Sequence, residues 1–230
     1  MLTIPKYPII LAPMSTSDSC PVLSRHEPGT LQEAHPSLIL ASASRTRLAL
    51  LQDAGLMVTV RPAAIDEASI KQAARAEGAG PDQTALRLAD LKAGQIRDAD
   101  AIVIGADQIL VCEGRWFDKP SDIMTARAHL VALRGRSHEL HTAVVLHHGG
   151  RTIWQHVARP RLTMRAFSDA ALEAYLTLEA EHILSSVGAY RLEGPGIQLF
   201  VDVEGEHSAI LGLPLLALLD CLRRHGVLLR

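Results

Sequence analysis

The chain has 230 residues, 48% of them hydrophobic and 21% charged, which suits one large globular domain or two small lobes with a sizeable core. Its net charge of −2 argues against a general nucleic-acid-binding protein, and no apolar run reaches the roughly 20 residues that span a bilayer. The three cysteines form no C-x-x-C pair, which argues against a disulfide framework or structural zinc site and favours a reducing, cytoplasmic location.

Residues 1–36 differ from the rest of the chain in composition. Prolines stand at positions 5, 8, 13, 21, 28 and 36, serines lie between them, and no helical or strand period is visible. Such a segment buries too little apolar surface to order itself. We therefore predict a disordered N-terminal extension over residues 1–36 and a folded domain over residues 37–230.

From Leu38 onward, hydrophobic periods and capping residues predict alternating strands and helices. The predicted strands cover residues 38–41, 57–60, 101–104, 138–148, 151–164 and 197–203. The predicted helices cover residues 45–54, 82–96, 122–133, 169–178 and 214–226. Ser44, Ser121 and Ser168 are the expected N-caps of the first, third and fourth helices. The His-Gly-Gly sequence at 148–150 predicts a hairpin turn.

The order of these elements predicts the fold class. Strands and helices alternate early and a hairpin lies in the middle, which indicates an α/β protein with a mixed β-sheet flanked by helices. In such sheets, ligands bind at the carboxyl ends of strands. Polar residues follow two predicted strands, at 42–47 and at Asp107, so we expect a ligand cleft at these strand ends.

The segment 41–47, Ala-Ser-Ala-Ser-Arg-Thr-Arg, combines small residues with the start of a helix. Free N–H groups at a helix N-terminus favour anions, and the helix dipole disfavours cations there. Arg45 and Arg47 in the first turn therefore indicate a bound anion, although a capped surface helix with solvated arginines explains the spacing equally well. The sequence contains no Walker A loop and no G-x-G-x-x-G.

Carboxylates follow two of the predicted strands. Asp107 comes after the apolar strand 101–104 and the pair Gly105-Ala106, and Asp66-Glu67 follows the second strand. A carboxylate in such a position can hold a divalent metal or polarise a water molecule. Each also fits a simpler role, as a turn aspartate that caps nearby N–H groups or as a solvated acidic turn.

Two lysines are further candidates. Lys92 lies on the predicted helix 82–96, where a lysine is usually solvated on the helix face. Lys119 precedes Pro120, which restricts Lys119 to an extended backbone and aims its side chain reproducibly.

The histidines do not predict a metal site or a catalytic triad. His138 and His141 lack the H-E-x-x-H spacing and face opposite sides of a strand, and His147 and His148 lie at the hairpin turn. We interpret them as residues of a solvated strand. No G-x-S-x-G elbow supports Ser-His-Asp catalysis.

Taken in order, these motifs resemble the Maf family of nucleoside triphosphate pyrophosphatases, from about residue 38 to residue 226. The matching blocks are Ser-x-Ser-x-x-Arg at 42–47, Asp66-Glu67, Lys92-Ala93, Gly105-Ala106-Asp107, Lys119-Pro120, Leu133-Arg134-Gly135 before His138, Gly188-Ala189-Tyr190, Glu193-Gly194 and Leu211-Gly212-Leu213-Pro214. So many blocks in one order make a chance similarity improbable.

The resemblance implies a Maf-like fold and hydrolysis of a nucleoside triphosphate between its α- and β-phosphates, with Mg²⁺ or Mn²⁺ as cofactor. It also implies removal of non-standard nucleotides and a homodimer. The site residues that it implies are Asp107 as proton acceptor, Glu67 and Asp107 at the metal, Lys92 and Lys119 as further catalytic residues, and Ser42, Ser44 and Arg47 at the substrate phosphates. The sequence leaves open whether Asp107 is the base, a metal ligand or both.

The positions that the family uses near the base favour 7-methyl-GTP as substrate. Gln108 and Glu193 match the branch that resembles 7-methyl-GTP pyrophosphatases, whereas the dTTP/UTP branch has Thr and Gln at these positions. A glutamate only accepts hydrogen bonds, and a guanine edge offers paired N–H donors. Arg45 stands where the family usually has Pro, and Thr46 where it has a large residue, so the alternative is a dTTP/UTP-directed or broad-specificity pyrophosphatase.

Two hypotheses of another class stay open. A regulatory protein that acts through contacts in cell division, an association that the family also carries, would not need the ordered cations and carboxylates. A nucleotide-binding module without turnover would need them for binding alone. The expected partner is a nucleoside triphosphate, with no nucleic acid and no membrane.

Overall fold

The computed structural model describes residues 30–180 and 182–230. Within these residues, eight strands form one sheet in the order β2-β1-β3-β5-β7-β8, with β4 paired to β3 and β6 paired to β5. The strands are β1 (Leu38–Leu40), β2 (Val58–Val60), β3 (Ile102–Cys112), β4 (Arg115–Phe117), β5 (Ser137–His148), β6 (Arg151–Ala158), β7 (Arg161–Met164) and β8 (Phe200–Glu204). β1 is parallel to β2 and β3, and the other pairings are antiparallel.

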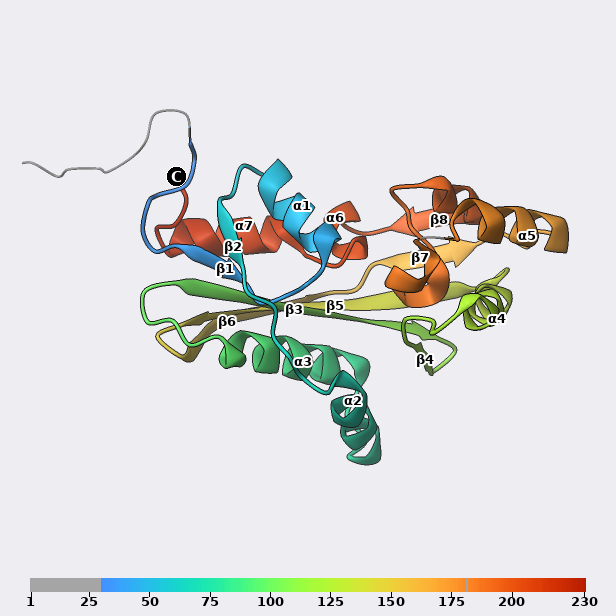
Figure 1. Ribbon diagram of the computed structural model, residues 1–230, viewed down its shortest axis with the longest axis horizontal. Coiled ribbons are helices and arrows are strands. Elements are labelled where there is room, and N and C mark those ends of the chain that lie inside the picture. Colours follow the sequence, from blue (N-terminus) through green and yellow to red (C-terminus); the bar gives the residue numbers. More distant parts are fainter. Residues whose placement is uncertain (1–29, 181) are drawn as a thin grey trace, which may run out of the picture.

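Helices cover both faces of this sheet, which confirms the predicted α/β class. They are α1 (Arg45–Asp53), α2 (Glu67–Ala76), α3 (Pro81–Gln95), α4 (Ile123–Leu133), α5 (Asp169–Leu178), α6 (His207–Ile210) and α7 (Leu215–Arg224). In Figure 1, α2 and α3 lie on one side of the sheet, and α1, α6 and α7 lie on the other. In the part of the chain that the structure describes, no helix is long and apolar enough to cross a membrane.

The strand β1 shows why the sheet is buried on both faces. Leu38 and Leu40 pack in one cluster with side chains of α1 and α7, while Ile39 packs in another with Ala93 of α3. A strand covered on both faces has a continuous apolar sequence rather than an alternating one. A third cluster joins α4, α5, β7 and β8 at the far end of the sheet (Figure 1).

The strand β3 continues well past residue 104, where the sequence pattern predicts its end. Asp107 therefore lies in the middle of the strand, opposite Ala143 of β5, and not at a strand end. The prediction is wrong here because the residues after Asp107 become apolar again and pair with both β4 and β5. The ligand cleft expected at strand ends lies at the carboxyl end of β1, and Asp107 reaches it from within a continuous strand.

Three elements, α2, β4 and α6, were absent from the predicted pattern. Asp66 is the N-cap of α2, and its side chain accepts a hydrogen bond from the N–H of Ser69 at 3.1 Å. The acidic pair interpreted as a turn therefore starts a helix. β4 and α6 contain three and four residues, too few to show a hydrophobic period.

Two of the three predicted caps are confirmed. Ser44 and Ser168 are the N-caps of α1 and α5. The third prediction is shifted by one residue, because Asp122 rather than Ser121 accepts the N–H of Thr125 at 2.7 Å and caps α4.

The predicted strands after the hairpin have different bounds in the structure. The β5–β6 hairpin around Gly149 and Gly150 is confirmed. The strand predicted over residues 151–164 divides into β6 and β7 near Pro160, which has no N–H to donate to a ladder. The first part of the strand predicted over residues 197–203 is a 3₁₀ helix, Pro195–Leu199, and β8 follows it.

The predicted extension reaches too far into the fold. Gln32 is 5% exposed, and its side chain exchanges two hydrogen bonds with the backbone of Met57. Gln32 also forms a β-bridge with Leu228, and the N–H of Glu33 donates to the carbonyl of Val227. These residues belong to the folded part of the chain. The prediction for residues 1–29 lies outside the described residues.

Gly105 of β3 sets the distance between the sheet and α3. A Cβ atom at this position would lie 2.1 Å from the backbone oxygen of Ala89 and 2.9 Å from the backbone nitrogen of Ala93. No side chain fits in that space, so only glycine lets α3 pack this closely. The close packing brings Lys92 of α3 beside Asp107 of β3.

We expect Gly105→Ala to lower the free energy of unfolding by about 3 kcal/mol, because α3 must move away from the sheet. Gly94→Ala is the matched control on α3. There a Cβ would meet the ring of His147 at an ordinary 3.5 Å, and alanine favours a helix over glycine by about 1 kcal/mol. Urea unfolding measures both variants, and a Gly105→Ala protein as stable as the wild type would contradict the close packing.

Candidate active site

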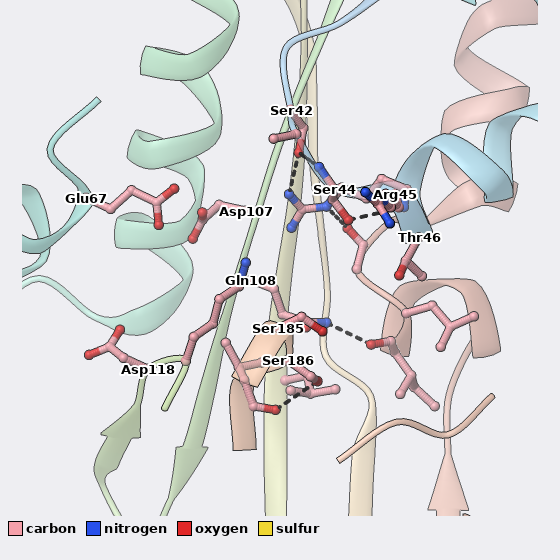
Figure 2. A pocket seen from close by; sticks show the side chains of 18 of the residues that line it. Ser42, Ser44, Arg45, Thr46, Glu67, Asp107, Gln108, Asp118, Ser185 and Ser186 are labelled. Carbon is pink, nitrogen blue, oxygen red and sulfur yellow. Dashed lines mark hydrogen bonds between the residues drawn. The ribbon is translucent and has the colours of Figure 1, made fainter. Parts of the chain in front are cut away.

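A cleft of about 1300 Å³ brings together residues that lie far apart in the sequence. All of the site residues predicted from the sequence line it. They are Ser42, Ser44, Thr46, Arg47, Glu67, Lys92, Asp107, Gln108, Lys119 and Glu193. Figure 2 shows the carboxylates of Glu67 and Asp107 pointing toward one another, with Ser44 at the start of α1.

The turn between β1 and α1 presents unpaired N–H groups to the cleft. Ser44 Oγ accepts the N–H of Arg47 at 3.3 Å, and Ser42 Oγ accepts the N–H of Ser44 at 3.2 Å. Within the described residues, the N–H groups of Arg45 and Thr46 have no hydrogen-bond partner. Both lie at the positive end of the helix dipole, so this turn can bind a phosphate oxygen.

Arg47 ties this turn to two other segments. Its Nε donates to the carbonyl of Gly212 at 2.8 Å, and its Nη1 donates to the carbonyl of Ala106 at 2.9 Å and to Ser42 Oγ at 3.2 Å. Burial lowers the pKa of Arg47, the nearby carboxylates raise it, and an arginine keeps its proton at neutral pH. Because its partners are neutral, Arg47 keeps a positive charge that is available to a phosphate.

Lys92 links the two carboxylates of the site. Its Nζ lies 2.6 Å from Oε1 of Glu67 and 2.6 Å from Oδ1 of Asp107. Lys92 and Asp107 are both buried, and Oδ2 of Asp107 has no hydrogen-bond partner among the described residues. A buried acceptor left without a donor costs roughly 1–3 kcal/mol. Native proteins seldom tolerate that cost, so Oδ2 is available to a water molecule or to a ligand atom.

Glu67 faces the cleft from the first turn of α2, while Asp66 is used as the helix cap. Partial burial raises the pKa of Glu67, but the hydrogen bond and charge of Lys92, with the charges of Lys71 and Lys119, outweigh that effect. The pKa of Glu67 therefore lies below its ordinary value. The carboxylate is ionised and, with its side chain 44% exposed, accessible to a ligand.

Lys119 adds a second cation to this part of the cleft. Burial and the charge of Arg47 lower its pKa, as does the charge of Lys92, against the opposite effect of the two carboxylates. No carboxylate lies within ion-pair distance of Lys119 in the part of the chain that the structure describes. Lys119 is thus free to pair with an anion.

An ion pair that the sequence pattern does not predict holds the segment before Lys119. Nζ of Lys71 lies 2.7 Å from Oδ1 of Asp118, which joins α2 to the segment between β4 and α4. Lys71 stands four residues after Glu67 and therefore on the same face of α2. That spacing becomes informative only when residues 67–76 are known to be helical.

Gln108 lines the cleft, but its amide group is used by the fold. Nε2 donates to Oγ1 of Thr142 at 2.8 Å and to the carbonyls of Ala209 and Ile210 at 3.0 Å. Only Oε1 is left for a ligand. Glu193 is exposed at the same cleft. The larger aliphatic residues in this lining are Leu140, Val187, Leu192, Ile210 and Leu211.

The interpretation of the histidines as a solvated strand is wrong for three of them. His138, His141 and His147 are buried, because β5 is covered on both faces. His138 Nε2 pairs with the hydroxyl of Tyr190 at 2.8 Å, and burial lowers the pKa of His138 to about 4. His141 and His147 pair with aspartates of α3. Among the described residues, no group of three or more His, Cys, Asp or Glu side chains could hold a metal ion.

The site joins a helix start with free N–H groups, two cations that have no carboxylate partner among the described residues, and two carboxylates, the partly exposed Glu67 and the buried Asp107. These features define an α/β protein whose charged, polar cleft suits a phosphate-bearing ligand. The sequence profile described as Maf-like protein matches residues 37–225. The chain therefore belongs to the Maf family, as its motifs predict.

Relatives of the chain are similar over almost their whole length. A nucleoside triphosphate pyrophosphatase of Granulibacter bethesdensis is 54% identical over 193 residues, which cover 83% of this chain and 98% of the relative. A second protein of that name, from Gluconobacter oxydans, is 53% identical over 195 residues, 84% of this chain and 96% of its own. A 7-methyl-GTP pyrophosphatase of Rhizobium meliloti is 46% identical over 195 residues, 84% and 98% of the two chains.

We expect Lys92→Met to raise the pKa of Glu67, because the hydrogen bond and charge that oppose its burial are removed. A carboxylate whose pKa is lowered by folding stabilises the folded state at a pH above its ordinary pKa. This stabilisation is lost as the pH falls through the lowered pKa. The variant should therefore unfold at a higher pH on acidification. Carboxyl ¹³C NMR titration measures the pKa, and Lys71→Met, which removes only a charge effect, should give a smaller rise. An unchanged Glu67 pKa in Lys92→Met would refute this account of the site.

Proposed function

We propose that the protein hydrolyses a nucleoside triphosphate between the α- and β-phosphates, to give a nucleoside monophosphate and pyrophosphate. The observation that supports this most is the carboxylate of Asp107. One of its oxygens is held by Lys92, and the other is buried and has no donor among the described residues. The names of the relatives are consistent with this activity.

In this mechanism, Oδ2 of Asp107 accepts a proton from a water molecule as the water oxygen attacks the α-phosphorus. The bond from the α-phosphorus to the bridging oxygen breaks, and pyrophosphate leaves. Lys92 keeps Oδ1 in place and so fixes the orientation of the carboxylate. Lys119 and Arg47 have no carboxylate partners among the described residues and neutralise the charge that develops on the leaving group.

The donor set fits a divalent cation. Mg²⁺ keeps several water ligands and is usually held by one or two carboxylates together with substrate phosphates. Glu67 and Asp107 offer two carboxylates, and Oδ2 of Asp107 has no other partner among the described residues. These two residues would hold Mg²⁺ or Mn²⁺, which when bound withdraws charge from the phosphate oxygens. Oδ2 of Asp107 has two lone pairs, so one would face the metal ion and the other would accept the proton of the attacking water.

For the base we propose guanine, with 7-methyl-GTP as the preferred substrate. The amide nitrogen of Gln108 is bonded to Thr142, Ala209 and Ile210, so Gln108 offers only an acceptor. Glu193 is likewise an acceptor. Two acceptors beside an apolar lining suit the N–H donors of a guanine edge better than the mixed edge of thymine or uracil. A dTTP/UTP-directed or broad-specificity enzyme is the alternative.

The proposal extends to the setting of the enzyme. The family resemblance implies a homodimer and a role in removing modified nucleotides. The buried Cys112 and Cys221 carry free thiols, which agrees with the reducing environment of the cytoplasm.

Asp107→Asn tests the reaction itself. We expect a loss of roughly 10²–10⁴-fold in kcat, because the amide cannot accept the proton from water. Pyrophosphate release from a nucleoside triphosphate with Mg²⁺ measures the rate, and Asp100→Asn, at an exposed position, is the control. Retained binding of a fluorescent nucleotide by Asp107→Asn would show that the fold is intact. Wild-type turnover in this variant would instead favour a binding or regulatory protein.

A panel of triphosphates tests the base. We expect faster pyrophosphate release from 7-methyl-GTP than from dTTP or UTP. Faster release from dTTP or UTP would contradict the guanine proposal. Glu193→Gln replaces an acceptor by a mixed donor and acceptor, so it should lower the preference for 7-methyl-GTP roughly tenfold. Glu173→Gln, on the surface of α5, is the control and should leave the preference unchanged.

A further inference from the structure

Arg75 of α2 lines both the cleft and a second hollow of about 480 Å³ beside it. The hollow is also lined by Arg115 and Trp116 of β4 and by small residues at the ends of two turns. Among these, Gly78 and Gly114 leave open space, since a Cβ on either would meet nothing within 4 Å. The hollow therefore adjoins the cleft at Arg75 and has two arginines in its wall.

Both arginines are held by aromatic rings rather than by carboxylates. The guanidinium carbon of Arg75 lies 4.7 Å from the centre of a Trp116 ring, and that of Arg115 lies 4.7 Å from the centre of the Phe117 ring. Stacking on a ring face orients a guanidinium without neutralising its charge by an ion pair. Both side chains thus remain able to bind an anion.

The nearest acidic residues in the sequence do not neutralise these arginines. Glu77 pairs with Arg87 at 2.9 Å, and Glu113 pairs with Arg136 at 3.5 Å. Neither Arg75 nor Arg115 has an ion pair within the part of the chain that the structure describes. The hollow is a local concentration of positive charge in a protein whose net charge is −2.

The position of Arg75 relative to the reaction centre indicates which part of a ligand it would meet. Glu67, Lys71 and Arg75 are spaced by four residues and share one face of α2. Arg75 is two turns from Glu67, about 12 Å along the helix axis. That distance exceeds the span of the two anhydride linkages from an α- to a γ-phosphate. Lys71, between them, is already paired with Asp118.

We propose that Arg75 and Arg115 form a subsite for a phosphate group carried beyond the γ-phosphate, so that the enzyme also accepts nucleotides with a longer phosphate chain. This inference rests on the proposed function, because it places the α-phosphate at Glu67 and Asp107. The extra phosphate is either the end of a nucleoside tetraphosphate or a linking phosphate of a dinucleoside polyphosphate. Hydrolysis at the α–β bond gives the nucleoside monophosphate and the rest of the chain in both cases.

The test compares three substrates with one common product. GMP formation is measured from guanosine 5′-triphosphate, guanosine 5′-tetraphosphate and diguanosine 5′,5′-tetraphosphate, with the full chain and Mg²⁺. The variant Arg75→Gln/Arg115→Gln removes both charges, and Arg97→Gln/Arg127→Gln removes two surface charges elsewhere as the control. We expect the first variant to lower the ratio of tetraphosphate to triphosphate kcat/KM roughly tenfold, because charge-assisted contacts to the extra phosphate are lost. The control should leave the ratio unchanged.

The outcomes separate this inference from the proposed function. If the triphosphate is hydrolysed and the ratio is the same in both double variants, the subsite is wrong and the pyrophosphatase activity stands. If the wild-type protein yields GMP from none of the three substrates, the proposed pyrophosphatase function is wrong, and the subsite that rests on it is wrong too. A ratio that falls for guanosine 5′-tetraphosphate alone assigns the subsite to a terminal phosphate. If the kcat/KM ratio also falls for diguanosine tetraphosphate, the subsite binds a linking phosphate and leaves room for a second nucleoside.

Discussion

Burial of the Lys92 ammonium between two carboxylates is the constraint on which the site depends. An ammonium stays charged inside a protein only with partners at hydrogen-bond distance, and Glu67 and Asp107 provide them from a helix and a strand. The contact requires α3 to lie against β3 at the distance that Gly105 permits. It also draws the first turn of α2 toward the sheet. One set of contacts thereby fixes three elements relative to one another.

The opposite wall of the cleft is fixed by hydrogen bonds to backbone carbonyls instead. Arg47 joins α1 to β3 and to Gly212, and Gln108 joins β3 to α6. A carbonyl satisfies a guanidinium donor without cancelling its charge, whereas Lys92 has a carboxylate on each side. The cleft therefore presents positive charge along the start of α1 and carboxylate oxygens at Glu67 and Asp107. A phosphate chain with a bound divalent cation carries the complementary pattern of charge.

Local sequence signals were sufficient for much of this arrangement. The cap at Ser44 and the apolar run before Asp107 are visible within a few residues, and the order of the motifs predicts the family. Contacts between distant segments leave no such signal. Nothing near Gln108 shows that its amide bonds to carbonyls 101 and 102 residues later. The helix α2 was missed because Asp66 fits a turn as well as a cap, and the histidines of β5 were misjudged because burial depends on what covers a strand.

The two ends of the cleft also differ in how deeply their side chains are buried. Lys92 and Asp107 are buried and tied to each other, so a change at either disturbs the packing of α3 on β3 as well as the chemistry. Thr46 is only half-buried and Glu193 is exposed, so substitution there costs little stability. In the proposed function, the residues beside the base can therefore vary while the reaction centre stays unchanged. The proposed reaction type then depends on buried residues, and the proposed base preference depends on a few side chains nearer the surface.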